Sequence, residues 1–156
     1  MTRVLIAGGA ASVIACVLMA AGDAAPYPKD YRRWVHVKTT VIGPQSPNFA
    51  RNGGVHHFYA NALAMEGYRS GKFPDGAVLI DDLLEAKEVD GVTSVGARKR
   101  VAVMTKQSGR FGETGGWDFE IFKGDPAAAT LTPEGKVACF GCHQKGRDSV
   151  FSEFRE

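Results

Sequence analysis

The sequence predicts a mainly β (α+β) fold, in which an antiparallel sheet is accompanied by a few helices. Several short stretches alternate apolar and polar residues, which is the period of a half-buried strand. Turns containing Gly, Pro or Asn separate these stretches at hairpin spacing. One stretch carries clear signals for both ends of a helix. The 156 residues, of which 44% are hydrophobic and 23% charged, suit one domain with one core.

Five stretches are expected to form the strands, because they are rich in β-branched and aromatic residues. They are Val35–Ile42, Val55–Ala60, Ala77–Ile80, Arg98–Lys106 and Trp117–Phe122. In the second of these strands, successive side chains point to opposite faces, so His56 and Phe58 share one face and His57 lies on the other. The third strand is expected to end in the acidic run Asp81–Glu85.

The clearest helix is predicted between Asn61 and Gly71. Asn61 can cap the first turn with its side chain, and Gly71 can end the helix in a left-handed conformation. Leu63, Met65 and Tyr68 are expected to face the core.

Smaller helical segments are expected towards the two ends of the chain. Pro28 and the charged and aromatic residues around it favour a short helix or turn over 27–34, with Trp34 packed inward. A terminal helix carrying Val150, Phe151 and Phe154 is expected after the loop 123–136 and the motif that follows it.

The first 25 residues are predicted to be a signal peptide. Arg3 precedes an apolar, uncharged run that ends in small residues, which is the pattern of a cleavable secretory signal. A retained membrane anchor is the first alternative, since the run is about as long as the ~20 residues that cross a bilayer. A lipoprotein anchored through Cys16 is the second. The prediction is therefore a signal peptide over 1–25, a mature domain over 26–156 and a periplasmic location.

The C-terminal region contains the run Cys139-Phe140-Gly141-Cys142-His143, which is the attachment motif of a c-type haem. Two thiols three residues apart on one helical turn can each bond to a haem vinyl group, and the histidine that follows can bind the iron. We therefore expect one covalent haem c on a C-terminal attachment helix. His143 is the expected proximal iron ligand, and its other ring nitrogen should be hydrogen-bonded.

Two other interpretations of the motif are weaker. A zinc site of this type needs a second Cys or His pair, and no such pair is at ligand spacing in the sequence. A redox dithiol or disulfide would be expected after a strand in an α/β pattern, whereas this motif follows a loop rich in Gly, Pro and Ala. Once residues 1–25 are removed, Cys139 and Cys142 are the cysteines that remain.

Six short motifs occur along the chain in an order that is more specific than any one of them. They are Tyr31-Arg32-Arg33-Trp34, His56-His57-Phe58-Tyr59-Ala60-Asn61, Phe73-Pro74-Asp75-Gly76-Ala77-Val78, Val103-Met104-Thr105-Lys106, Gly116-Trp117 and Cys139-Phe140-Gly141-Cys142-His143. In this order the mature chain, 26–156, resembles the cytochrome P-460 family, which includes the cytochromes c′-beta.

The resemblance implies a mainly antiparallel β fold, usually a homodimer, that holds one high-spin haem c with an open distal side. It also implies chemistry on small nitrogen species. Cytochromes P-460 oxidise hydroxylamine with a haem cross-linked to a lysine, whereas the c′-beta members lack this bond and bind nitric oxide in an apolar, phenylalanine-capped pocket. An oxidoreductase acting on these molecules, with a cytochrome c as redox partner, is one expectation. A six-coordinate electron-transfer cytochrome c is the alternative.

Several residues are candidates for the distal side. Phe58 and Phe73 are expected to provide an apolar cap, although each is also a normal core residue. Lys87 is the candidate for a cross-link, because the strand after the turn Phe73–Gly76 contains no earlier lysine. Glu134 is the candidate general base. For the electron carrier, the sixth ligand would come from the set His56, His57, Met65 and Met104.

The charge balance argues against a nucleic-acid partner. The chain has 19 Lys and Arg against 17 Asp and Glu, giving a net charge of +2, and no basic cluster stands out.

Overall fold

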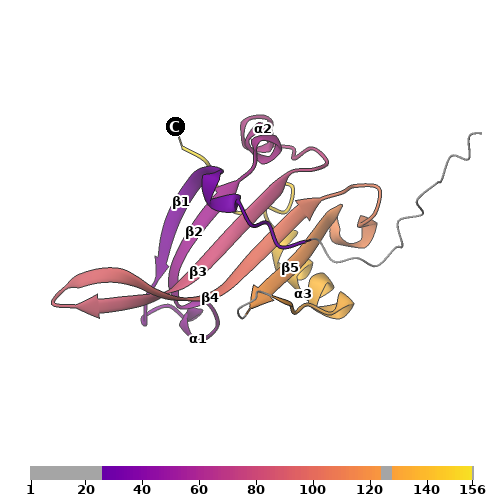
Figure 1. Cartoon of the computed structure of the whole chain (residues 1–156). Helices are drawn as coiled ribbons and strands as arrows, with labels where there is room; N and C mark the ends of the chain where they lie inside the picture. Colours follow the sequence, from indigo (N-terminus) through magenta and orange to yellow (C-terminus); the bar gives the residue numbers. More distant parts are fainter. Residues whose placement is uncertain (1–25, 124–127, 156) are drawn as a thin grey trace, which may run out of the picture.

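The computed structural model describes residues 26–123 and 128–155. They form one six-stranded antiparallel sheet in the sequential order β1-β2-β3-β4-β5-β6 (Figure 1). The strands are β1 (Val35–Ile42), β2 (Gly54–Ala60), β3 (Val78–Val89), β4 (Val92–Lys106), β5 (Trp117–Lys123) and β6 (Ala128–Ala129). The helices are η1 (Tyr31–Arg33), α1 (Phe49–Asn52), α2 (Ala62–Ser70), η2 (Gly112–Thr114) and α3 (Pro133–His143). The predicted antiparallel β fold with few helices is confirmed.

The expected signal peptide lies outside the described residues. Within the described ranges, no helix combines the length and apolarity that crossing a membrane requires.

The sheet has an apolar cluster on each face, as strand alternation dictates. On one face, Leu79 and Phe119 belong to a cluster that also includes Ala64 and Met65 of α2, and Cys139 of α3 packs against it. The opposite face carries a second cluster of buried residues, which consists of Tyr31, Ile80, Val101, Val103 and Phe122. The helices α2 and α3 therefore cover the first face, and the N-terminal turn covers the second.

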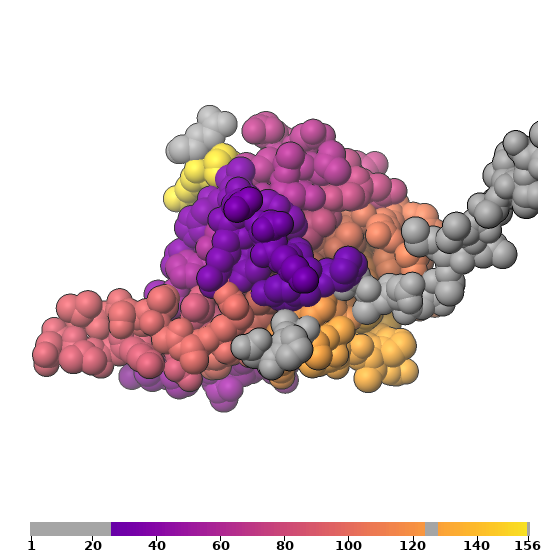
Figure 2. Space-filling view, in the orientation of Figure 1, coloured from indigo at the N-terminus to yellow at the C-terminus, as the bar shows by residue number. Residues whose placement is uncertain are grey.

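The β3–β4 hairpin is much longer than predicted. The expected acidic end of the third strand lies inside β3, which continues to Val89, and β4 begins at Val92. Asp82 can remain in the strand because it is fully buried and paired, with Arg98 Nε at 2.8 Å and Arg32 Nη2 at 2.9 Å. The distal half of the hairpin extends beyond the neighbouring strands as an exposed arm (Figures 1 and 2).

Helix α2 has the predicted bounds and caps. The Asn61 side chain accepts a hydrogen bond from the Ala64 amide at 2.8 Å, and Gly71 ends the helix with φ 79°. Met65 is buried as expected, but the prediction for Leu63 is wrong, because its side chain is 38% exposed near the start of the helix.

The predicted terminal helix is wrong. Residues 147–150 form a tight turn, and 151–155 contain no regular structure. Asp148 and Ser149 have φ values of 45° and 66°, which a right-handed helix excludes. At the other end of the chain, the short helical turn is confirmed as η1, but Tyr31 is its buried residue, whereas Trp34 is half-buried.

Helix α3 begins at Pro133, whereas the sequence predicted that a loop would continue to residue 136. Thr132 caps its first turn by accepting a hydrogen bond from the Gly135 amide at 3.2 Å, and Pro133 occupies the first helical position. The helix carries the whole C-x-x-C-H motif and ends at His143.

Candidate functional site

A cavity of about 490 Å³ lies between the first face of the sheet, α3 and the C-terminal segment. Its volume is within the range of roughly 300–1,000 Å³ that is usual for small-molecule and cofactor sites. The strands β1 to β5 all contribute residues to its wall, among them Phe58, Leu79, Ala102 and Phe119. The wall is thus largely apolar, with a few charged groups at defined positions.

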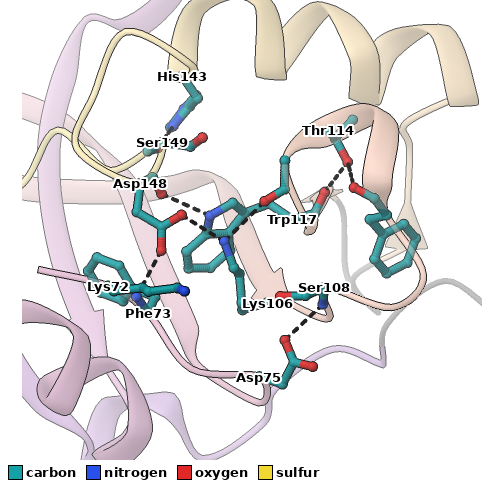
Figure 3. Close-up of polar contacts among 12 residues, drawn as sticks. Lys72, Phe73, Asp75, Lys106, Ser108, Thr114, Trp117, His143, Asp148 and Ser149 are labelled. Atoms are coloured by element: carbon teal, nitrogen blue, oxygen red, sulfur yellow. Dashed lines mark hydrogen bonds and ion pairs between the residues drawn. The ribbon is translucent and has the colours of Figure 1, made fainter.

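His143 lines this cavity at the C-terminal end of α3. Its Nδ1 lies 3.0 Å from the carbonyl oxygen of Ser149 (Figure 3), and because a carbonyl can only accept, Nδ1 carries the hydrogen. The lone pair of Nε2 is then available to a metal. The rings of Phe119 and Phe151 hold the imidazole, each with its centroid 5.2 Å away. The predicted hydrogen bond to the second ring nitrogen is confirmed.

The two cysteines of the motif are free thiols. Cys139 lines the cavity, and as residue i to His143 at i+4 it shares one side of α3 with the histidine. Burial raises the pKa of the Cys139 thiol, and the neighbouring Cys142 raises it further. Cys142 is exposed. Among the described residues, no three His, Cys, Asp or Glu side chains gather as ligands for a metal ion.

A polar group occupies one part of the cavity wall. His56 Nδ1 lies 2.8 Å from Asp81 Oδ1, and His56 Nε2 lies 2.7 Å from the carbonyl oxygen of Asn52. Arg100 Nη2 is 3.0 Å from Asn52 Oδ1 and 3.9 Å from Asp81 Oδ2. Burial lowers the pKa of His56, but the hydrogen bond and charge of Asp81, together with the Asn52 carbonyl, outweigh it and raise the pKa overall.

The wall also presents basic groups to the cavity. The Nε of Arg100 is buried and has no hydrogen-bond partner within the described residues, which is costly for a charged donor. Lys38 and Arg51 line the same cavity. A haem has a flat apolar body, two carboxylates and an iron. The apolar wall suits the body, and the basic side chains, including the unpartnered Arg100 nitrogen, suit the carboxylates. The available imidazole of His143 suits the iron, and the Cys139 thiol lies in the same cavity.

A comparison with known families identifies the relationship. The family model for cytochrome P460 matches residues 28–152. The chain belongs to the cytochrome P460 family. No curated protein matches the sequence. As a cytochrome P460 family member, the protein is a haem cytochrome, and the cavity beside α3 is the place where its residues fit the haem.

The predicted distal residues are only partly brought together. Phe58 lines the cavity, and its ring stacks on that of His56 with a centroid separation of 6.0 Å. Phe73 is not in the lining; it is 4% exposed in the core, with its ring 5.5 Å from that of Trp117. The phenylalanine-capped apolar wall therefore has one of its two expected rings, and it adjoins the polar group of His56 and Asp81.

The two predicted catalytic side chains lie away from the cavity. Lys87 pairs with Ser94 in the exposed arm of the β3–β4 hairpin and is not part of the lining. Glu134 is exposed in the first turn of α3, where backbone and Thr132 hydrogen bonds lower its pKa. A lowered pKa weakens a carboxylate as a general base.

Sequence reasoning missed Lys38, Asp81 and Arg100, which line the cavity. Asp81 pairs with Phe58 in β2 and with Ala102 in β4, so it follows Phe58 onto the same face of the sheet. The signal available in the sequence was the alternation of apolar and polar residues in β2, which predicts the face on which Phe58 lies. Residues opposite Phe58 on neighbouring strands share that face. Using that signal required knowing which residues of β3 and β4 stand opposite β2.

Proposed function

We propose that this protein is an exported, monohaem c-type cytochrome. The sequence contains one C-x-x-C-H run, which supports one haem bonded to Cys139 and Cys142. His143 is the proposed iron ligand, since its Nε2 is left available by the hydrogen bond between Nδ1 and Ser149. Lys38, Arg51 and Arg100 are the proposed partners of the two haem carboxylates, because their charges complement them.

We propose further that the iron position opposite His143 is open and binds small nitrogen species. The observation that carries this proposal is that both ring nitrogens of His56 are engaged, by Asp81 and by the Asn52 carbonyl. His57 bonds to Thr39 on the other side of β2, and Met65 of α2 is buried in the core. None of these three side chains offers a ligand atom to the cavity.

The residues of the cavity favour nitric oxide as the ligand. A haem iron with an open position supplies the bond to such a diatomic molecule. Phe58, Leu79 and Ala102 exclude water from the sheet side, which suits a small neutral ligand. The hydrogen-bonded pair of His56 and Asp81 places one polar group in this otherwise apolar part of the wall.

The absorption spectrum of the ferrous protein and a titration with nitric oxide test this function. We expect a high-spin spectrum that changes at low concentrations of nitric oxide. A low-spin spectrum in both oxidation states, with no response to nitric oxide, would support the electron-transfer cytochrome instead. Met104 lines the cavity and is the thioether that would serve as sixth ligand in that case. Met104→Leu should leave the spectrum unchanged if the position is open, and should convert it to high spin if the thioether is bound.

We also propose a periplasmic location, a homodimer and a cytochrome c as redox partner. Export is supported by the signal pattern in 1–25, and the homodimer by the family resemblance. The exposed hairpin arm carries Val89, Val92 and Val95, each at least half exposed, which is apolar area suited to a second copy of the chain. Light scattering on the purified holoprotein measures the oligomeric state directly, and a monomeric mass at all concentrations would reject the dimer.

A further inference from the structure

The turn that positions His143 has an unusual conformation. The Val150 amide donates to the Arg147 carbonyl at 3.0 Å, and the two residues between them, Asp148 and Ser149, both have positive φ. Gly, Asn and Asp are the usual residues at the centre of such a turn, because they adopt positive φ at low cost. Ser149 is not one of these residues, so contacts from other parts of the chain are expected to stabilise the turn.

Asp148 receives such contacts from three separate elements (Figure 3). Its Oδ2 accepts from the Phe73 amide at 2.8 Å, and its Oδ1 lies 2.7 Å from Lys106 Nζ. Its backbone carbonyl accepts from Trp117 Nε1 at 2.9 Å. The side chain and the backbone of Asp148 are thus both fixed, and the adjacent Ser149 carbonyl is fixed with them.

Lys106 is the buried counterpart of this carboxylate. Its side chain is 6% exposed, its Nζ also donates to the Gly115 carbonyl at 3.0 Å, and it lies 4.9 Å from the centroid of the Trp117 ring. Gly115 in turn packs against Phe140 of α3, the helix that carries the motif. Removing the Asp148 charge would leave the Lys106 ammonium buried without its charged partner, which a protein interior disfavours strongly.

We propose that Lys106 and Asp148 are positioning residues for the iron ligand. They hold the turn so that the Ser149 carbonyl accepts the Nδ1 hydrogen of His143, and so they set how strongly this histidine binds the haem iron. A hydrogen bond at Nδ1 raises the basicity of the ligating ring, and a more basic ligand favours ferric over ferrous iron. This inference rests on the proposed ligand role of His143.

The test uses the holoprotein with Asp148→Asn and Lys106→Gln. Asparagine tolerates the positive φ of position 148, so the first variant removes the charge while preserving the turn propensity. We expect both variants to raise the reduction potential and to lower the iron–imidazole stretching frequency of the ferrous protein. A tenfold shift of the ferric–ferrous equilibrium corresponds to about 59 mV for one electron.

Asp82→Asn is the matched control, because it removes another ion-paired carboxylate, which accepts a hydrogen bond from Tyr31 on the opposite face of the sheet. It should leave both readouts at their wild-type values. Lys106→Arg keeps the positive charge, so we expect it to retain the wild-type potential and stretching frequency. If Lys106→Gln folds too poorly to be measured, Asp148→Asn and Lys106→Arg still test the inference. Unchanged readouts in both pair variants, or equal changes in the control, would overturn the inference.

The same measurements separate this inference from the proposed ligand role. If the wild-type ferrous protein has no iron–imidazole band, the proposed ligation by His143 fails, and the inference fails with it. If the band is present but does not move in Asp148→Asn or Lys106→Gln, the ligation stands and only the role of the ion pair is rejected.

Discussion

His56 is a buried imidazole whose pKa is raised in the folded protein. Burial by itself lowers that pKa, but Asp81 and the Asn52 carbonyl stabilise the protonated ring more strongly. A folded-state pKa above the unfolded value of about 6.5 means that protonation stabilises the fold. The contribution is complete below about pH 6.5 and is lost as the pH rises through the folded-state pKa.

His56→Gln should therefore destabilise the protein more at pH 5.5 than at pH 8.5. We expect the two losses to differ by on the order of 1 kcal/mol, as measured by urea unfolding at each pH. Asp81→Asn removes the charge that raises the pKa of His56, so in that background the difference should disappear. Equal losses at the two pH values in the wild-type background would show that His56 is not protonated preferentially in the fold.

The two thiols of the motif should attach the haem covalently. In Cys139→Ala/Cys142→Ala, we expect no haem-stained band after denaturing electrophoresis, because no thioether can form. Each single variant keeps one thiol and serves as a control that should retain part of the stain. A stained covalent band from the double variant would disprove attachment through these residues.

At the scale of single residues, spacing predicted that Cys139 and His143 lie together, whereas composition did not distinguish cavity residues from core residues. Cys139 and His143 share a side of α3 because four positions separate them, so sequence alone could predict their arrangement. Phe58 and Phe73 look alike in the sequence, yet one lines the cavity and the other fills the core. The difference depends on which distant segments pack against each ring, and no local pattern records that.

At the scale of elements, the cap of α2 is expected to be unusually important for stability. The Asn61 side chain accepts from the Ala64 amide at 2.8 Å and the Val78 amide at 3.0 Å, and it donates to the Gly76 carbonyl at 2.9 Å. It thus ties the start of α2 to the start of β3. Asn61→Ala should cost about 2 kcal/mol of unfolding free energy, at the upper end for a helix cap.

Thr132→Ala provides the comparison for this prediction. Thr132 caps α3 by accepting a hydrogen bond from the Gly135 amide at 3.2 Å, and among the described residues its side chain makes no bond to another strand or helix. Its loss should cost about 1 kcal/mol, as is typical of a cap, when the midpoint of urea unfolding is measured in the same way. Equal losses in the two variants would show that the bonds from Asn61 to Val78 and Gly76 contribute nothing beyond capping.

The strands and helices were predicted correctly where apolar and polar residues alternate or where a helix has clear capping residues. The predicted ends were wrong where a charged residue is paired inside the fold. Asp81 and Asp82 suggested a strand end, but β3 passes through them because Arg98 and Arg32 neutralise Asp82 inside the fold. The terminal segment has apolar residues at helical spacing, but the contacts of Asp148 with distant residues force a turn there. In both places, long-range ion pairs overruled the local pattern.

At the scale of the whole molecule, the two faces of the sheet differ: one lines the cavity, and the other packs against the N-terminal turn. The first face, together with α3, encloses the cavity, and the second face packs under the N-terminal turn around Tyr31. The order of the six motifs was sufficient to predict the family, which the match over residues 28–152 confirms. The side chains on the cavity wall depend on register across β1 to β5, so the sequence predicted Phe58 in the wall but missed Lys38, Asp81 and Arg100.

The arrangement of the cavity predicts slow or absent oxidation of hydroxylamine. That reaction requires proton removal from the substrate by a base, and the resemblance associates it with a lysine bonded to the haem. Asp81 is a carboxylate in the cavity wall, but one of its oxygens is already bonded to His56 and the other lies 3.9 Å from Arg100. Lys87 is held in the exposed hairpin arm, away from the cavity.

Turnover of hydroxylamine with an electron acceptor, together with mass spectrometry of the haem peptide, decides this prediction. We expect a haem peptide without an attached lysine, and turnover near the rate without protein. Lys87→Ala should change neither result. Lys38 lines the cavity, with its Nζ 5.6 Å from the centroid of the Phe58 ring. Because Lys38 is a lysine inside the cavity, Lys38→Ala is the stricter test for a lysine bonded to the haem. A haem adduct containing a lysine, lost together with turnover when that lysine is replaced, would make the protein a hydroxylamine oxidase, because the bonded macrocycle and not the open iron position would then determine the reaction.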